Sequence, residues 1–238
     1  GIYGRASIAQ EQFDVLLKSD LIEKGYHYSD LPFIFMQHIL EETYDKPLNQ
    51  LFLERIAIPL GLESTVFSPL KSIAKERIVP SEIDTYFRQQ TLQGYVHDMT
   101  AALQGGVSGH AGLFSSAKEV ATIMQLFLQK GYYNGQKLFS ATTFDQFNQC
   151  YYCSEGNRRG VGLDKPQAGG GGMTFQGISS ESFGHAGFTG TYAWADPSTG
   201  IVFVFLSNRT YPSMENRKLI DHSIRPRMLK LVYDAIVY

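Results

Sequence analysis

Apolar and polar positions are most clearly ordered near the C-terminus, where they predict a β-hairpin. Residues 184–196 (GHAGFTGTYAWAD) are rich in strand-forming side chains, and the turn 197–200 separates them from the apolar run 201–206 (IVFVFL). Two such runs joined by a turn that contains proline and glycine predict a hairpin. Because the second run is apolar at every position, we expect it to be a central strand covered on both faces.

The first of these runs also contains His185 among Gly184, Gly187 and Gly190. Glycine weakens a strand unless another group must come close to its backbone. Two interpretations fit this pattern. The segment either faces a ligand or is a core hairpin with a histidine on its surface.

Helical spacing dominates the rest of the chain. A cap at Asp30 with Pro32 in the first turn, a cap at Ser115 or Ser116, and a cap at Ser140 or Thr142 mark three helix starts. The expected helices cover residues 9–24, 31–44, 48–58, 117–129, about 140–149 and 214–236, whereas 63–95 reads as irregular and the glycine run 169–172 as a mobile loop. Helices followed by a hairpin and a last helix predict an α+β fold, with a sheet backed by that helix.

Composition and charge narrow the class of protein. The 238 residues are 43% hydrophobic, which is enough for one substantial core, and the net charge of -2 without a basic stripe argues against nucleic-acid binding. No apolar run is long enough for a membrane span. The first residues have no signal-peptide pattern and no initiator methionine, so we expect that something precedes Gly1 in the natural protein.

The two cysteines, Cys150 and Cys153, are candidates for a metal site or a redox pair. One Cys-x-x-Cys pair supplies too few ligands for zinc, and a redox pair would open a helix after a strand, whereas this one precedes a loop-like stretch. A redox pair and two cysteines without a special role both stay open. His97 and Asp98 are adjacent in sequence, so they are poorly placed to converge on a metal, and we expect neither metal nor cofactor.

Three short motifs, taken in order, carry a resemblance to a known family. They are Tyr28-Ser29-Asp30 before an apolar helix, the glycine-rich segment 109–116 (GHAGLFSS), and His185-Ala186-Gly187. In this order they resemble the serine β-lactamase and penicillin-binding-protein superfamily. The most similar branch contains the class C β-lactamases and related esterases and D-alanyl peptidases. The resemblance runs from about residue 26 to the C-terminus. It implies one β-lactamase/transpeptidase-like domain, with a mostly helical lobe at 26–180 and the hairpin and helix of an α/β lobe at 181–238.

The resemblance also implies roles for individual residues. Tyr28 would accept or relay the proton of a serine nucleophile, Asp30 stands where the family has asparagine, and His185 replaces a lysine. The N–H group of Phe188, after the close-approach residue Gly187, would donate to the oxyanion, and His110 would line the same site. Simpler structural roles remain open for three of these residues. Tyr28 would then only pack at a helix start, Asp30 would only cap the helix, and His110 would only shape a turn.

Three further segments narrow the resemblance, namely 109–115, 157–160 (NRRG) and 207–209 (SNR). Together they resemble the β-lactamase-type domain that some bacterial glycoside hydrolase family 3 proteins (β-N-acetylglucosaminidase-like) carry. This resemblance implies a periplasmic or cell-envelope location, a small-molecule or peptidoglycan-type substrate, and a glycoside hydrolase domain covalently linked in the parent protein.

The family nucleophile, the serine of a Ser-x-x-Lys motif upstream of the tyrosine triplet, is missing. The matches at 68–71, 72–75 and 115–118 all follow Tyr28, and a helix cap explains the third. We therefore expect a chain that lacks the N-terminal strands and the nucleophile helix, and that is inactive as it stands. The alternative is a non-catalytic accessory domain.

Two further expectations follow from these departures from the family. With Asp for Asn, His for Lys and Ala186 for Thr, even an intact parent should be a weak β-lactamase that is closer to an esterase or amidase. Without its N-terminal strands, the sheet should expose an edge and favour self-association.

Overall fold

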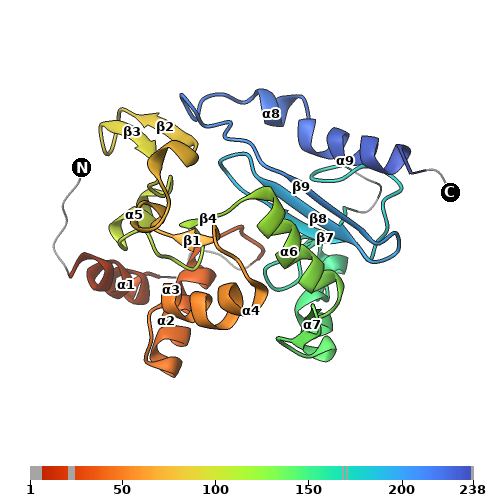
Figure 1. Cartoon of the computed structure of the whole chain (residues 1–238), viewed down its shortest axis with the longest axis horizontal. Helices are drawn as coiled ribbons and strands as arrows, with labels where there is room; N and C mark the ends of the chain where they lie inside the picture. The colour runs from red at the N-terminus through yellow and green to blue at the C-terminus, as the bar shows by residue number, and fades with distance from the viewer. Residues whose placement is uncertain (1–6, 21–24, 168, 170, 237–238) are drawn as a thin grey trace. The chain divides into compact units, whose positions relative to one another are not determined.

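The computed structural model describes residues 7–20, 25–167, 169 and 171–236 (Figure 1). The chain forms two compact units, which are described separately. The first comprises residues 1–58, 63–114 and 211–213, and the second comprises 59–62, 115–210 and 214–238.

Helices of the first unit pack around a small apolar core that contains Ile34, Leu51 and Ala57. Its two longest helices contact each other through aromatic rings. Phe13 of the first stacks on the ring of His38 of the second at a centroid distance of 3.7 Å. The elements are α1 (Ile8–Lys18), α2 (Leu31–Tyr44), α3 (Leu48–Phe52), a π-helical turn (Leu53–Ala57) and α5 (Met99–Leu103), while α4 (Ile58–Leu60) begins at the unit's last residue before the boundary. The expected helix at 48–58 is therefore one continuous helical segment with a π-helical turn inside it. It ends at Leu60, two residues beyond the expected end. Helix α1 ends at Lys18, and residues 21–24 of the expected helix 9–24 lie outside the described part of the chain.

Residues 63–95 were expected to be irregular, and this was wrong. Strand β1 (Val66–Phe67) pairs with β4 (Leu113–Phe114), and β2 (Pro80–Asp84) forms an antiparallel hairpin with β3 (Gln90–Gln93). The hairpin escaped notice because its inward positions include carboxylates, so apolar and polar residues do not alternate. Glu82 and Asp84 are both buried on β2.

The second unit is built on a three-stranded antiparallel sheet in the order β7–β8–β9 (Figure 1). Strands β7 (Phe183–Ala186), β8 (Tyr192–Asp196) and β9 (Ile201–Phe205) pair in simple register, with His185 opposite Ala193 and Trp194 opposite Phe203. The expected hairpin is therefore confirmed, but its first run contains two strands and not one. The unit also contains α6 (Ala117–Leu128), α7 (Ala141–Asn148), α8 (Lys218–Asp221), α9 (Ile224–Asp234) and the small hairpin of β5 (Tyr132–Tyr133) and β6 (Gln136–Lys137).

Alternation along β8 distributes its side chains between two cores, since successive residues of a strand point to opposite faces. Ala195 packs with Met124 of α6 and Phe144 of α7, whereas Tyr192 and Trp194 pack against Leu229 of α9. The expected α+β arrangement, with a sheet backed by the last helix, is confirmed.

Strand β9 was expected to be central, and this was wrong. Within the described residues it pairs only with β8 and lies at the end of the sheet, although both of its faces contact other elements. An apolar run indicates that both faces of a strand are buried, but it does not show whether both edges are hydrogen-bonded. The sequence pattern therefore could not distinguish a central strand from one at the end of the sheet.

Helix boundaries elsewhere follow the expected caps. Ser116 accepts a hydrogen bond from the N–H of Glu119 and starts α6, and Ser140 does the same for Thr143 in α7. The expected helix 214–236 is instead two helices, because Ser223 adopts a φ of 48° between α8 and α9. None of the described helices is long and apolar enough to cross a membrane.

Candidate active site

Strand β7 carries His185 on a backbone that lies very close to its neighbour. A Cβ atom at Gly184 would lie 2.2 Å from the carbonyl oxygen of Ala193 and 2.4 Å from the ring of Trp194. Only glycine fits here, because the backbone of Ala193 and the ring of Trp194 occupy the space that a side chain would need. This explains one glycine of the motif without invoking a ligand.

The turn between β7 and β8 also requires glycines. The N–H of Gly187 donates to the carbonyl of Thr191 at 2.9 Å, and a Cβ at Gly187 would lie 2.2 Å from the Thr191 hydroxyl. Gly190 has a φ of 114°, which favours glycine, and its carbonyl accepts a hydrogen bond from Ser207. The turn 187–191 is therefore fixed by its own hydrogen bonds and by Ser207, which follows β9.

Two buried arginines fix the same turn. Arg225 of α9 donates to the carbonyl oxygens of Gly187 and Thr191, both at 3.3 Å. Arg209 donates through Nε to the carbonyl of Phe188 at 2.8 Å. Burial lowers the pKa of both guanidinium groups from their usual value, but an arginine remains charged at any physiological pH. Hydrogen bonds from two charged guanidinium groups therefore hold the backbone of this turn in place.

Phe188 lies on this turn and is 62% exposed. The guanidinium of Arg209 lies 4.5 Å from the centre of the ring, within the range of a cation–π interaction. Arg209 therefore contacts both the backbone carbonyl and the ring of Phe188. That the N–H of Phe188 donates to an oxyanion stays a prediction.

His185 projects from β7 with its side chain 40% exposed. Its Nε2 atom lies 3.1 Å from Nη1 of Arg159, and its Nδ1 atom lies 3.0 Å from the carbonyl oxygen of Ala186. The buried carboxylate of Asp164 lies 4.0 Å from Nε2. The imidazole is therefore part of a charged cluster, and both of its nitrogens have partners.

Tyr28 and Asp30 lie in the first unit, at the start of α2. The side chain of Tyr28 is exposed, in the segment just before the helix. Asp30 occupies the N-cap position, and its carbonyl accepts the N–H groups of Phe33 and Ile34, but its carboxylate makes no capping hydrogen bond. The Ser29 hydroxyl accepts the N–H of Leu31 instead. The predicted cap is therefore correct in position, and the side chain that serves it is Ser29.

His110, also in the first unit, lies between a serine and an aspartate. Its Nδ1 atom lies 2.8 Å from the Ser108 hydroxyl, and its Nε2 atom lies 2.9 Å from Oδ1 of Asp98. These residue types form a nucleophile relay in many hydrolases, but Ser108 is only 2% exposed and so cannot meet a substrate. The arrangement therefore fixes the loop around His110.

Asp98 links the His110 loop to α5, because its carboxylate also accepts the N–H of Ala101. Burial by itself would raise the pKa of Asp98, but hydrogen bonds from His110 and from the N–H of Ala101 outweigh it and lower the pKa below its ordinary value. The ionised form is thus favoured. Sequence analysis noted Asp98 only as a poor metal ligand, and its helix-cap position was the signal that could have revealed its structural role.

The loop of His110 lies against α2. The amide of Gln37 accepts the N–H of Gly109 at 2.9 Å, and a Cβ at Gly109 would lie 2.1 Å from the carbonyl oxygen of Phe33. The structure therefore joins the His110 loop to the helix that begins after Asp30. His185, Gly187 and Phe188 belong to the second unit, and the two groups are described separately.

The three Ser-x-x-Lys matches differ from the arrangement expected of a family nucleophile. Ser68 adopts a φ of 49° before a 3-10 turn, Ser72 follows that turn, and Ser115 precedes the cap of α6. None of these serines lies inside an α-helix, where serine and lysine three positions apart would share one face. The expectation that the nucleophile lies outside these residues stays a prediction.

Two further observations concern the cysteines, whose role was open, and metal binding. Cys150 and Cys153 form a disulfide. Among the described residues, no group of three or more His, Cys, Asp or Glu side chains is placed to hold a metal ion.

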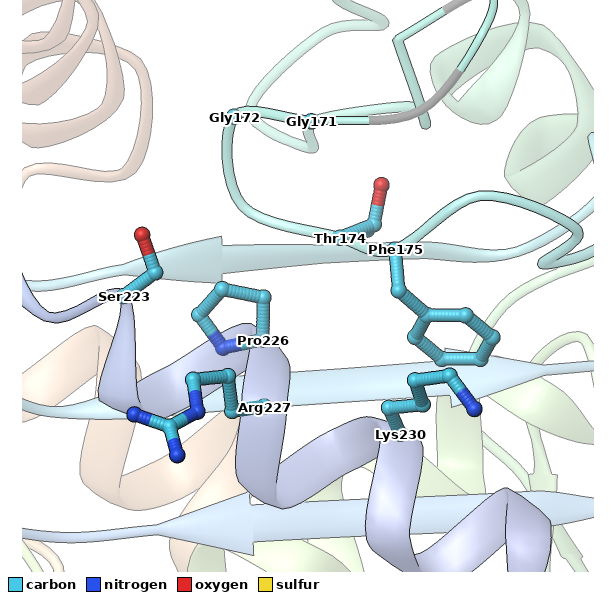
Figure 2. Close-up of a pocket in the computed structure, with 8 residues that line it drawn as sticks. All are labelled: Gly171, Gly172, Thr174, Phe175, Ser223, Pro226, Arg227 and Lys230. Carbon is cyan, nitrogen blue, oxygen red and sulfur yellow. The ribbon is translucent and has the colours of Figure 1, made fainter.

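A pocket of about 290 Å³ lies between the loop 171–175 and the first turns of α9 (Figure 2). It is lined by Gly171, Gly172, Thr174, Phe175, Ser223, Pro226, Arg227 and Lys230. None of these is a predicted site residue. The expected mobile loop at 169–172 borders this pocket, and Gly170 lies outside the described residues.

Comparison with known proteins decides the family. The β-lactamase family model matches residues 15–224, which is most of the chain. The chain belongs to the β-lactamase family. Its fold is therefore that of the β-lactamase family, as the resemblance implied.

Two curated relatives of this β-lactamase-family chain share one name. A protein of Escherichia coli (strain K12) named "Putative D-alanyl-D-alanine carboxypeptidase" is 36% identical over 199 residues, which cover 77% of this chain and 45% of that protein. A protein of the same name from Salmonella enteritidis is 35% identical over 205 residues, with 81% of this chain and 47% of that protein covered. The chain thus spans about half the length of the curated relatives it matches.

Solved structures of the family share the fold at low identity. D-amino acid amidase from Ochrobactrum anthropi SV3 superposes with a TM-score of 0.62 at 15% identity, covering 97% of this chain and 66% of that one. EstCE1, a hydrolase with promiscuous acyltransferase activity, gives a TM-score of 0.59 at 18% identity, with 94% and 63% covered. The β-lactamase/transpeptidase-like fold is therefore confirmed.

Sequence reasoning missed the arginines that support the candidate site. Arg159 and Arg209 lie in the segments 157–160 and 207–209, which had been noted only as part of the resemblance, and Arg225 had not been noted. An arginine between apolar positions of the last helix was the available signal for Arg225. No local pattern indicates that Arg159 contacts His185, because 26 positions separate them.

Proposed function

We propose that this chain contributes part of the acyl-transfer site of a serine hydrolase that cleaves an ester or amide bond. The observation that supports this most strongly is the turn after His185-Ala186-Gly187, which two buried arginines hold in place. Backbone N–H groups stabilise a developing oxyanion best when they are fixed before the reaction begins. The β7–β8 turn meets that requirement.

In the proposed reaction, a serine oxygen forms a bond to the acyl carbon and the leaving group departs with a proton. Water then hydrolyses the acyl-enzyme and regenerates the serine. Tyr28 relays the serine proton, and the N–H of Phe188 donates to the oxyanion. The serine itself comes from outside these 238 residues, so the chain alone does not turn over substrate.

We infer that the substrate is a cell-wall peptide ending in D-alanine, or a related ester or amide. The names of the curated relatives support this class. Asp30 adds negative charge where the family has a neutral donor, and Ala186 lacks the hydroxyl that would help to hold a β-lactam carboxylate. The full-length protein is therefore a poor β-lactamase.

The test is turnover by the full-length protein that carries this chain. We expect hydrolysis of a D-alanyl-D-alanine peptide or a p-nitrophenyl ester, with little hydrolysis of nitrocefin. Replacing the proton relay by Tyr28→Phe should lower kcat/KM at least about 100-fold, the usual contribution of general acid–base catalysis. Tyr44→Phe, at the other end of α2, is the matched control and should leave kcat/KM unchanged.

Each alternative outcome has a defined meaning. Full activity of Tyr28→Phe would contradict the relay, and nitrocefin hydrolysis at rates typical of β-lactamases would contradict the substrate class. Failure to turn over every substrate would favour a non-catalytic accessory domain, such as one attached to a glycoside hydrolase.

A further inference from the structure

The segment 158–165 forms a small hairpin against the outer edge of β7, next to His185. Arg159 and Asp164 are bridge partners within it, and the N–H of Lys165 donates to the carbonyl of Arg158 at 2.8 Å. Asp164 then exchanges two backbone hydrogen bonds with Gly184 of β7, at 2.7 and 3.1 Å. Backbone pairing therefore places the side chains of Arg159 and Asp164 beside the imidazole.

The carboxylate of Asp164 organises this cluster. Asp164 is only 2% exposed, and a buried carboxylate is stable only when it is paired. Its Oδ2 atom lies 3.0 Å from Nη1 of Arg158, and its Oδ1 atom forms an ion pair with Nη1 of Arg159. Because the same Nη1 of Arg159 lies 3.1 Å from Nε2 of His185, one guanidinium nitrogen bridges the carboxylate and the imidazole.

The chemistry of these partners determines where the imidazole carries its proton. A guanidinium has only N–H donors, so Nε2 of His185 must accept with its lone pair. The carbonyl of Ala186 can only accept, so Nδ1 of His185 must donate. A neutral imidazole protonated on Nδ1 satisfies both contacts. An imidazolium, or the other tautomer, would direct an N–H group at the guanidinium.

We propose that Arg159 is a positioning residue that holds His185 as the neutral Nδ1–H tautomer and carries the positive charge at this position. Two residues thus replace the lysine of the family motif. His185 occupies its position on the strand as a neutral side chain, and Arg159 supplies the positive charge. Two guanidinium groups against the one carboxylate of Asp164 leave a net positive charge in the cluster. The catalytic meaning of this assignment rests on the proposed function, but the assignment itself does not.

The tautomer of His185 can be measured directly in the 238-residue chain. Two-bond ¹H–¹⁵N spectra of the ¹⁵N-histidine-labelled chain distinguish the two neutral tautomers and the imidazolium, and His185→Gln identifies the resonance. Near pH 7.5 we expect the Nδ1–H pattern in the native chain. Arg159→Met should lose that pattern, because Nε2 then has no obligate donor and the Asp164 carboxylate becomes its strongest neighbour.

Two further variants separate the proposed role from general disruption. Arg158→Met removes the other guanidinium on Asp164 and should keep the Nδ1–H pattern, and Arg159→Lys, which retains a cationic donor, should restore it. An Nε2–H or imidazolium pattern in the native chain would overturn the proposal, as would an unchanged pattern in Arg159→Met. The native spectrum is decisive even if a variant does not fold. Absent turnover with the Nδ1–H pattern intact would contradict only the proposed function.

Discussion

At the residue scale, single buried carboxylates fix local structure that hydrophobic patterning does not reveal. Asp84 accepts the N–H groups of Tyr86, Phe87 and Arg88 at the turn between β2 and β3, and it also pairs with the guanidinium of Arg88. Burial by itself would raise the pKa of Asp84, but the N–H of Phe87 and the guanidinium and N–H of Arg88 outweigh it and lower the pKa. The turn therefore depends on the ionised carboxylate.

Asp84→Asn should lower the free energy of unfolding at pH 7 by about 2–3 kcal/mol, because a buried arginine loses its charged partner. Since the pKa of Asp84 is lower in the folded chain, its stabilisation is present above the unfolded pKa and is lost as the pH falls through the folded value. The difference between native and variant chains should thus shrink below about pH 4. Urea unfolding followed by circular dichroism at pH 7 and pH 3 measures this.

The matched control is Asp145→Asn, which removes an exposed carboxylate from its pair with Lys130. It should change the free energy of unfolding by less than about 0.5 kcal/mol at either pH. An equal loss for Asp84→Asn at both pH values would show that shape and not charge holds the turn.

At the element scale, the sheet and its helices were largely predictable, and the errors have physical causes. Ser116 and Ser140 marked their helices correctly, and the hairpin was found. The run 184–196 was read as one strand because Gly187 and Gly190 were interpreted as places of close approach, whereas they form the turn between β7 and β8. Ser223 breaks the last helix through a left-handed backbone conformation that serine rarely adopts.

The packing of α9 on the sheet gives a prediction at this scale. Leu229 is fully buried against Tyr192 and Trp194, whereas Leu231, two positions on, is 60% exposed. Leu229→Ala should lower the free energy of unfolding by about 2–5 kcal/mol, since it leaves a cavity beside the tryptophan. Leu231→Ala should cost less than about 0.5 kcal/mol.

Trp194 is the only tryptophan of the chain, so its fluorescence during urea unfolding reports directly on this contact. Similar losses for both leucine variants would mean that α9 does not pack on the sheet as described.

At the scale of the whole molecule, the candidate site could be predicted only as separate pieces. The motifs around Tyr28, His110 and His185 were identified from their order, and the family was correct. The support of the β7–β8 turn by Arg209, and the contact between Arg159 and His185, depend on long-range folding and leave no local pattern, whereas Arg225 stands out only as an arginine between apolar positions of the last helix. The roles of these residues in catalysis remain predictions.

The open end of the sheet gives a prediction for the isolated chain. Within the described residues, β9 pairs on one side only, and an unpaired strand edge is a template for another chain. We expect the 238-residue chain to self-associate as its concentration rises, and sedimentation velocity over a concentration series would detect this. A monomer at every concentration would contradict the expectation.

The proposed function requires a serine nucleophile that lies outside these 238 residues. The most direct measurement is labelling of the full-length protein with a fluorophosphonate, followed by mass-spectrometric identification of the modified serine. The proposed function predicts stoichiometric labelling of one serine in a Ser-x-x-Lys motif outside this chain, and no labelling of the isolated chain. Labelling of Ser68, Ser72 or Ser115, or the absence of any labelled serine in the full-length protein, would contradict it.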